Sequence, residues 1–399
     1  MPSQPPLKAG ELRVYNNAIE VGLPSGDTHA FHWAWLRDHC ECKRCRSSSG
    51  QKLFRIEHFD PPSTNVGLPV PTEDGFNVRW YDGHISQYSY QFLEKHQYGY
   101  DALKASIKKT ETPVWTGEEL RKAGGIPTFK YGDVLSSDRS LHDWLSALDV
   151  RGLTILNGAP LERGAVKTLC DRIEYLRMTM YGPTWDVESI PNPNNVAYTS
   201  LPLPLHADLC YYEVPPGVQL LHCIKFEQKT GGVNFFADAF KVAYDLKAQN
   251  PNAFNVLASV PTTFHKNDEK YHLEYAHPII ELQHPLDEVK AINWSPPFEG
   301  IQKIPSEFVE PYYAARRAWS QLLNQPQYSI ERRMAPGEIV IFNNRRVLHA
   351  RTAFDETAGH RLLEGGYIGS DEWTNKLRVL KRTYSPEATH IHRGSGYVL

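Results

Sequence analysis

A chain of 399 residues exceeds the ~250–300 residues at which one hydrophobic core usually stops growing, which favours a large domain with a smaller companion. Hydrophobic residues make up 41% and charged residues 22%, as in ordinary globular proteins, and the formal net charge of −3 excludes a strongly basic nucleic-acid-binding surface. No apolar run approaches the ~20 residues needed to cross a bilayer, and the first residues lack a signal-peptide pattern. We therefore expect a cytoplasmic protein without nucleic-acid or membrane partners.

The N-terminal part predicts a small β-rich domain. Residues 11–60 alternate short apolar runs (LRVYNNAIEV, FHWAW and LFRIEHF) with turn residues, and FNVRW at 76–80 predicts another strand. Residues 88–109 have helical character, and mixed turn and extended signals follow them. We place this domain at residues 1–95 and a linker region at 96–130.

Residues 131–399 predict an antiparallel β-sandwich with helices packed outside. SLHDWLSAL predicts a helix and GLTILN a strand, and 250–258 and 306–324 are predicted as core-packing helices. Helical or looping segments separate further strand-like runs, which are GVQLLHCI, GGVNFFAD, HPIIEL, EIVIFNN and LLEGGYIG. This order of elements is typical of a two-layer β architecture.

The uneven distribution of the six cysteines indicates a metal site rather than disulfides. Cys40, Cys42 and Cys45 lie close enough for one tight loop to direct three thiols at a single soft cation, as tetrahedral Zn²⁺ requires. The candidates for a fourth ligand are His32, His39, His58 and His84. We favour His84, which follows the strand FNVRW, with His58 as the second choice. The alternative is three buried free cysteines, which the charged neighbourhood disfavours. A metal with four protein ligands would stabilise the small domain rather than catalyse.

A second set of candidate ligands lies in the larger part of the chain. In an extended LHADL segment, His206 and Asp208 share a face, and His349 ends a later strand-like run, EIVIFNNRRVLH. Two histidines and one carboxylate form the set that binds Fe(II) and leaves the opposite positions open. Arg361 follows about one hairpin later, and its planar guanidinium can hold a carboxylate.

The alternative interpretation is that these residues are ordinary polar core or surface residues. Seventeen histidines supply many chance pairings, including His222 and His360. The ordered set of His-x-Asp, a long interval, a strand histidine, a short interval and an arginine favours the metal site.

Several motifs together resemble the gamma-butyrobetaine dioxygenase and trimethyllysine dioxygenase family over nearly the full length. The matching segments are LRDHCECKRC, WYDGHIS, YGPTWDV, NNVAYTS, LHADL, PPGVQLLHCIK, TGG, PGEIVIFNNRRVLHAR and HRLLEGGY. The resemblance implies a double-stranded β-helix (jelly-roll) catalytic domain, a zinc-binding N-terminal domain and a homodimer.

The resemblance also implies ligands for each cofactor. Iron would be bound by His206, Asp208 and His349, and Arg361 would hold the C5 carboxylate of 2-oxoglutarate, with Thr230 of the TGG turn as a second contact. Zinc would be bound by Cys40, Cys42, Cys45 and His84. The reaction would consume O₂ and 2-oxoglutarate, with ascorbate as a reductant.

An aromatic cage for a trimethylammonium group is expected from the same resemblance. Such a cation has no N–H to donate, so aromatic faces offer it both apolar contact and cation–π attraction. The family's cage positions are Tyr181, Trp185, Tyr198 and Tyr367 here. The alternative is that they are core aromatics with satisfied polar tips.

The predicted function is Fe(II)- and 2-oxoglutarate-dependent hydroxylation of gamma-butyrobetaine to L-carnitine. Asn195 would hydrogen-bond the substrate carboxylate, and Ser295 stands where a second carboxylate-binding asparagine is expected, which leaves a shorter donor. The alternatives are hydroxylation of trimethyllysine or another small quaternary ammonium compound, or a ligand-binding or scaffold protein with an inactive oxygenase fold.

Overall fold

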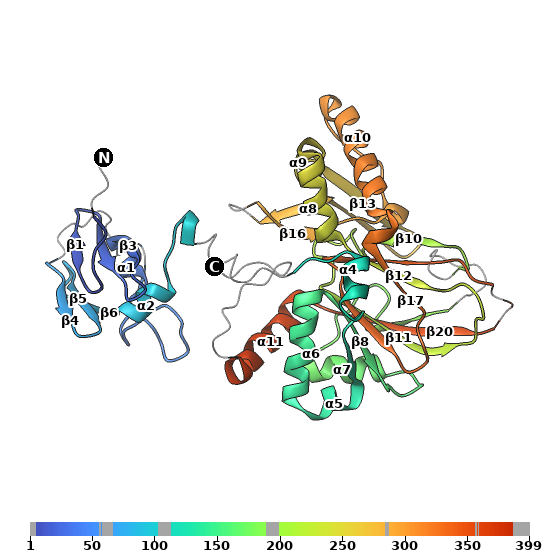
Figure 1. Ribbon diagram of the computed structural model, residues 1–399, viewed down its shortest axis with the longest axis horizontal. Helices are drawn as coiled ribbons and strands as arrows, with labels where there is room; N and C mark the ends of the chain where they lie inside the picture. The colour runs from blue at the N-terminus through green and yellow to red at the C-terminus, as the bar shows by residue number, and fades with distance from the viewer. Residues whose placement is uncertain are drawn as a thin grey trace. The chain divides into compact units, whose positions relative to one another are not determined.

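The computed structural model describes residues 5–55, 57, 67–102, 113–188, 199–283, 287–355, 357 and 359–385. It consists of two compact units, residues 1–105 and 106–399 (Figure 1). Residues 103–112, at the junction of these two units, lie outside the described part, so the boundaries placed at 95 and 130 stay a prediction. Among the described residues, none of the helices combines enough length and apolar character to span a bilayer.

The described residues of the N-terminal unit include two three-stranded antiparallel sheets and two short helices. The first sheet is formed by β1 (Leu12–Val14), β2 (Ala18–Gly22) and β3 (Thr28–His32), and the second by β4 (Val70–Thr72), β5 (Gly75–Arg79) and β6 (Ile85–Ser89). The helices are α1 (Trp33–Asp38) and α2 (Tyr90–Lys95). The core between them includes Ile19, Phe31, Leu36 and Phe76.

Three predictions for this unit are wrong in whole or in part. The run FHWAW does not form a single strand, because β3 ends at His32 and α1 begins at Trp33. In α1, the buried residues Trp33, Leu36 and Arg37 have the i, i+3, i+4 spacing of a helical face. Within 88–109, the described helical residues are α2, whose first turn is capped by the Ser89 hydroxyl, and 100–102 after a break at 96–99. The described residues of LFRIEHF form no strand.

The larger unit contains two facing sheets. The six-stranded sheet has the order β7 (Thr128–Lys130), β8 (Leu153–Asn157), β18 (Ile339–Asn343), β11 (Val218–Phe226), β20 (Arg361–Ile368) and β9 (Thr184–Val187). The four-stranded sheet has the order β10 (Leu203–His206), β19 (Val347–Arg351), β12 (Asn234–Asp238) and β17 (Ser329–Arg332). Every pairing is antiparallel except β7 with β8. The rings of Phe236 and Phe342, one from each sheet, lie 5.4 Å apart in the core between them. The predicted jelly-roll is therefore confirmed.

Helices cover the outer face of the six-stranded sheet. They are α5 (Tyr131–Ser136), α6 (Asp138–Arg151), α7 (Ala165–Ile173) and α11 (Ser370–Tyr384), and Figure 1 shows them grouped beside β8 and β11. Leu220 and Ile341 of the sheet pack against Trp144 of α6 and Leu377 of α11. The predicted strands GLTILN, GVQLLHCI, EIVIFNN and LLEGGYIG are all found in this sheet.

A second helical layer packs on the outer face of the four-stranded sheet. It contains α8 (Ala239–Gln249), α9 (Pro251–Ser259) and α10 (Ser306–Leu323), with two hairpins, β13 (Pro261–Asn267) with β14 (His272–Pro278) and β15 (Ile280–Gln283) with β16 (Glu288–Ile292). The predicted helices at 250–258 and 306–324 are confirmed as α9 and α10. The remaining short elements are α4 (Gly117–Lys122) and the 3₁₀ turns η3 (Pro296–Phe298) and η4 (Pro326–Tyr328).

Strand alternation determines which side chains enter the jelly-roll. On β20, Leu363 belongs to the core between the sheets and Ile368 to the helical layer, so Arg361 and Tyr367 share the inner face with Leu363. On β19, Val347 lies in the same inner core, which places His349 on the inner face too. Side chains from both sheets therefore meet inside the jelly-roll.

Candidate active site

The His-x-Asp segment and His349 come together where β10 ends beside β19. His206 is the last residue of β10 and pairs in register with His349. Asp208 Oδ1 lies 3.3 Å from His206 Nε2 and 4.0 Å from His349 Nε2. One ligand atom from each residue can be chosen so that all three lie within 4.8 Å of one another, which is close enough to share one ion.

The backbone turns sharply just after the aspartate. Because β10 ends at His206, Asp208 lies beyond the strand rather than within the extended segment that we predicted. Leu209 has φ 59°, in the left-handed region that costs a non-glycine residue about 1–2 kcal/mol. Surrounding contacts must therefore hold this conformation.

The protonation states suit metal binding. His206 Nδ1 donates to the Pro204 carbonyl at 2.8 Å, which leaves Nε2 free for a metal. Burial, with repulsion from His206, lowers the pKa of His349 to about 3, so its ring is neutral at neutral pH. Burial raises the pKa of Asp208, but both histidines and a hydrogen bond from Tyr367 outweigh it, and the net pKa lies well below the ordinary value. Two imidazoles and an ionised carboxylate are the donor set of non-haem Fe(II) oxygenases.

Arg361 is a buried cation on the inner face of β20. Its guanidinium lies 5.8 Å from the Phe226 ring centroid and 5.6 Å from that of Phe354, and no carboxylate pairs with it among the described residues. Burial, with repulsion from Arg351, lowers its pKa to about 9, so it stays charged at neutral pH. A buried charge without a partner is costly, and a ligand carboxylate is the group that fits it.

In the TGG turn, the residue that lies next to Arg361 is Gly232. A β-carbon on Gly232 would lie 3.8 Å from Arg361 Cδ and 3.1 Å from the Phe226 ring. The side chain of Thr230 is exposed. Gly232 therefore lies against the arginine, and the contact of Thr230 with 2-oxoglutarate stays a prediction.

Three of the predicted cage aromatics lie together beside the metal ligands. The rings of Trp185 and Tyr367 stack with centroids 4.3 Å apart, and that of Tyr181 lies 6.0 Å from Trp185. The Tyr367 hydroxyl donates to Asp208 Oδ2 at 2.7 Å. Trp185 pairs with Gly365 across β9 and β20, where any β-carbon would lie 2.4 Å from the indole. The glycine in EGGY is thus required for the aromatic cluster.

The remaining predicted substrate residues divide into two groups. Ser295 is fully buried, and its hydroxyl has no hydrogen-bond partner among the described residues. The preceding Trp294 carbonyl accepts the Ala207 N–H at 2.7 Å, which places Ser295 next to the metal-binding segment. Asn195 and Tyr198 lie outside the described residues.

Two polar residues near the site are missing from the sequence prediction. The hydroxyl of the buried Tyr211 lies 3.4 Å from that of Tyr181. Arg351 Nη2 donates to the carbonyls of Thr199 at 2.6 Å and Leu201 at 2.8 Å. The position of Arg351, two residues after His349 on a strand, could have indicated its inward direction.

A separate cluster lies in the N-terminal unit. His84 Nε2, presented by the β5–β6 turn, lies 3.4, 3.6 and 3.5 Å from the sulfur atoms of Cys40, Cys42 and Cys45. A tetrahedral ion with Zn–S of about 2.3 Å and Zn–N of about 2.0–2.1 Å separates such atoms by roughly 3.6 Å. All six cysteines are free thiols. The cluster therefore fits a tetrahedral zinc ion.

The other candidate histidines are bound elsewhere or lie outside the described part. His32 Nδ1 contacts the Tyr98 hydroxyl at 2.8 Å. His39 Nδ1 donates to the Trp35 carbonyl at 2.8 Å. His58 is among the residues that the structure does not describe.

Comparison with known proteins identifies the family. A family model described as "Taurine catabolism dioxygenase TauD, TfdA family" matches residues 115–367, and one described as "Gamma-butyrobetaine hydroxylase-like, N-terminal" matches residues 11–94. The gamma-butyrobetaine dioxygenase of Pseudomonas sp. (strain AK-1) is 33% identical over 92% of this chain and 95% of its own. The Homo sapiens gamma-butyrobetaine dioxygenase is 35% identical over 87% of this chain and 90% of its own. The chain belongs to the gamma-butyrobetaine dioxygenase family.

Membership of this family establishes the type of enzyme. It is a 2-oxoglutarate-dependent dioxygenase, and its cofactors are Fe(II) and 2-oxoglutarate. A trimethyllysine dioxygenase of Meyerozyma guilliermondii is also similar, at 27% identity over 91% of this chain and 94% of its own. Membership of the gamma-butyrobetaine dioxygenase family thus establishes the class of reaction. Which substrate the enzyme uses depends on the residues of the site.

Proposed function

We propose that this enzyme hydroxylates gamma-butyrobetaine to L-carnitine. The observation that carries the proposal is the aromatic cluster of Tyr181, Trp185 and Tyr367 directly beside Asp208. Aromatic faces bind a trimethylammonium group well because it cannot donate a hydrogen bond or lose its charge. The names of the Pseudomonas and Homo sapiens relatives, both gamma-butyrobetaine dioxygenases, support this substrate.

The chain's own residues would act mainly by positioning. His206, Asp208 and His349 would hold the metal, and Arg361 would grip the far carboxylate of 2-oxoglutarate through a bidentate contact. Bound Fe(II) and 2-oxoglutarate supply the oxidising chemistry, in which O₂ delivers one oxygen atom to a C–H bond and the other to succinate, with release of CO₂.

The specificity of the reaction would come from how the substrate is held. Tyr367 would serve two tasks, since its hydroxyl holds Asp208 while its ring lines the cage. Asn195 and the buried hydroxyl of Ser295 would bind the carboxylate at the other end of the substrate. Holding both ends fixes which carbon faces the metal, and such positioning is the protein's main contribution to selectivity.

The test is an assay with Fe(II), ascorbate as reductant and 2-oxoglutarate, in which gamma-butyrobetaine and trimethyllysine are offered separately. We expect carnitine and succinate in equal amounts from the first substrate alone. Turnover of trimethyllysine alone would reassign the substrate, and succinate without either product would direct attention to other quaternary ammonium compounds. Absence of succinate under all conditions would favour a ligand-binding protein with an inactive fold.

Replacing Trp185 with alanine should weaken binding of the substrate cation. One desolvated cation–π contact contributes ~1–2 kcal/mol, which corresponds to about a 5- to 30-fold higher dissociation constant. The measurement is gamma-butyrobetaine affinity for the anaerobic enzyme with Fe(II) and 2-oxoglutarate. A neutral analogue with a tert-butyl group in place of the trimethylammonium group should lose much less affinity.

The matched control for this variant is Trp185→Phe, which keeps an aromatic face against Gly365. We expect it to retain most of the cation affinity. Equal losses for the charged and neutral ligands would show that Trp185 provides only shape, and unchanged affinity would remove it from the cage.

We also propose that Cys40, Cys42, Cys45 and His84 bind one structural zinc ion. Structural zinc contributes ~10–16 kcal/mol in zinc-finger peptides, as much as the whole stability of a typical domain. His84→Ala should therefore lose zinc and unfold the N-terminal unit, seen as zinc content near zero and loss of near-ultraviolet circular dichroism. His39→Ala is the control, and zinc content near one in both variants would contradict the assignment.

The assembly and location of the enzyme are also proposals. A homodimer is supported by the family resemblance, and sedimentation equilibrium would test it. A cytoplasmic location is supported by the sequence composition, and fractionation of cells would test it.

A further inference from the structure

The last residue of β18 and the turn that leads to β19 form a run of four buried polar residues, Asn343, Asn344, Arg345 and Arg346. The most exposed of them, Arg345, is 8% exposed. Buried polar groups are costly unless each one is hydrogen-bonded, so the contacts of this turn define what it is built to hold. It leads directly into β19, which carries His349.

Asn344 holds the backbone of the metal ligand Asp208. Its Oδ1 accepts the Asp208 N–H at 2.8 Å, and its Nδ2 donates to the Asp208 carbonyl at 3.0 Å. One side-chain amide thus occupies both main-chain polar groups of that residue. The next residue, Leu209, has one of the two positive φ angles of non-glycine residues in the described part of the chain. The Asn344 contacts hold the chain where this strained conformation begins, and so fix the direction of the Asp208 carboxylate.

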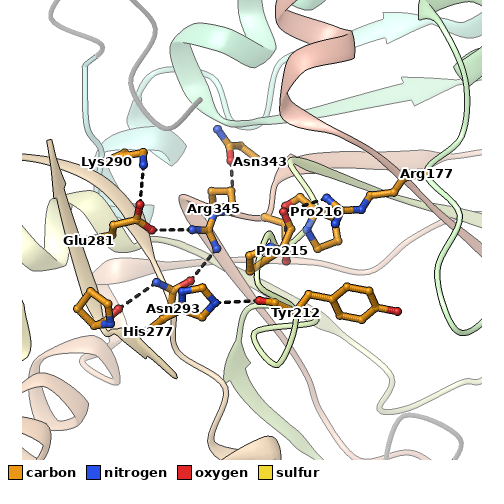
Figure 2. A network of polar contacts seen from close by, with 12 residues as sticks. Arg177, Tyr212, Pro215, Pro216, His277, Glu281, Lys290, Asn293, Asn343 and Arg345 are labelled. Atoms are coloured by element: carbon orange, nitrogen blue, oxygen red, sulfur yellow. Dashed lines mark hydrogen bonds and ion pairs between the residues drawn. The ribbon is translucent and has the colours of Figure 1, made fainter. Parts of the chain in front are cut away.

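Arg345 holds a different segment, as Figure 2 shows. Its Nη1 donates to Asn293 Oδ1 at 2.6 Å, and its Nη2 donates to Glu281 at 2.9 Å. Lys290 also contacts Glu281, at 2.6 Å. Burial raises the pKa of Glu281, but Arg345 and Lys290 outweigh it, and the net pKa lies below the ordinary value. The carboxylate is therefore charged and anchors the guanidinium.

The residue held by Arg345 is two positions before Ser295. Asn293 Nδ2 also donates to the Pro278 carbonyl at 2.9 Å, and its N–H donates to the Ile279 carbonyl at 2.9 Å. Three hydrogen bonds therefore fix Asn293 at the start of the segment that ends in the unpartnered Ser295 hydroxyl. The position of that hydroxyl depends on a network outside the metal site.

We propose that this turn positions the two halves of the active site separately. Asn344 positions Asp208 for the metal, and Arg345, through Asn293, positions Ser295 for the substrate carboxylate. Neither residue is placed in contact with metal or substrate, so both are positioning residues. The role of Arg345 rests on the proposed function of Ser295, whereas that of Asn344 rests only on the metal site.

A large cavity makes the hydrogen bonds of Arg345 accessible to a chemical test. Arg345, Glu281, Lys290 and His277 line a cavity of about 930 Å³, and the exposed residue Val214 lines the same cavity. A guanidinium ion can therefore reach the place vacated when the arginine side chain is removed. It would restore the contacts with Asn293 and Glu281 without a covalent link.

The experiment compares Asn344→Ala with Arg345→Ala. For Asn344→Ala we expect Fe(II) affinity to fall ~10–100-fold, as for other partners of metal ligands, measured by the visible band of the anaerobic Fe(II)–2-oxoglutarate complex. For Arg345→Ala we expect that affinity to stay within about twofold, while the KM for gamma-butyrobetaine rises about tenfold or more because the head group is misplaced. Millimolar guanidinium should lower the KM of Arg345→Ala and leave Asn344→Ala unchanged.

Hydrogen–deuterium exchange provides a readout that needs no substrate. Asn344→Ala should speed amide exchange in residues 205–211, where the Asp208 N–H loses its acceptor. Arg345→Ala should speed amide exchange in residues 290–296, where Asn293 loses its donor. If the wild type hydroxylates neither trimethylammonium compound, the proposed function fails, and the exchange pattern still decides the positioning roles. Identical changes in both peptides for both variants, or none in either, would overturn the proposal.

Arg346 supplies the matched control in the same turn. Its guanidinium binds Asp238 and the carbonyls of Val150 and Pro113, away from both halves of the site. Arg346→Lys should lower thermal stability and change neither Fe(II) affinity nor exchange in the two peptides. If the alanine variants do not fold, Asn344→Asp and Arg345→Lys take their place, because each removes only part of the hydrogen bonds. We then expect weaker Fe(II) binding for Asn344→Asp and a higher KM for gamma-butyrobetaine for Arg345→Lys.

Discussion

Replacing Asp208 with alanine is expected to abolish coupled turnover while zinc content stays near one per chain. Removal of residues that merely support a metal ligand costs ~10–100-fold, so loss of a ligand itself should exceed about 100-fold. The variant also frees the Tyr367 hydroxyl, which donates to Asp208. The measurements are product and succinate formation, the visible band of the Fe(II)–2-oxoglutarate complex, and zinc by elemental analysis.

The control for this variant is Asp171→Ala, which removes a carboxylate that pairs with Lys167 on the surface of α7. It should keep the visible band and full turnover. Loss of both metals from Asp208→Ala would contradict two independent sites, one in each unit. Retention of the band with normal Fe(II) affinity would remove Asp208 from the metal set.

Much of the fold follows from local patterns in the sequence. The strands β8, β11, β18 and β20 are apolar runs bounded by turn residues, and α10 shows its buried face at helical spacing. The order of His206, Asp208, His349 and Arg361 could be read because each lies at or near the end of such a run. The geometry at these positions depends on pairing between distant strands, and no local pattern contains it.

Two features that no local pattern indicates have this long-range origin. Trp185 reaches Tyr367 only because Gly365, its cross-strand partner, has no β-carbon. Asn344 binds Asp208 across a gap of 136 residues, and a pair of asparagines in a turn carries no local sign of that contact. The helix α1 was missed for another reason, since six residues rich in tryptophan fit a strand as well as a helix.

Replacing Arg361 with methionine is expected to have opposite effects on cofactor binding and on stability. Loss of a buried charged contact costs a ligand ~2–5 kcal/mol, which raises the KM for 2-oxoglutarate about 30-fold to several-thousand-fold. Without ligand, however, the wild-type guanidinium is buried and no carboxylate pairs with it in the described part of the chain. An apolar side chain of similar volume should therefore stabilise the ligand-free protein by about 1–4 kcal/mol.

Thermal unfolding with and without 2-oxoglutarate separates these two effects. The wild type should gain stability when 2-oxoglutarate binds, whereas Arg361→Met should unfold at a higher temperature without 2-oxoglutarate and gain nothing from it. Arg351→Met is the matched control, because this buried arginine donates to the carbonyls of Thr199 and Leu201 and its loss should destabilise. If Arg361→Met is destabilised to the same extent and keeps the KM for 2-oxoglutarate, its charge is structural. If Arg361→Met is instead more stable and has a higher KM for 2-oxoglutarate, the protein tolerates this unpaired buried cation because the cofactor neutralises it. The free enzyme is then less stable than it could be, and the arginine contributes affinity for the cofactor.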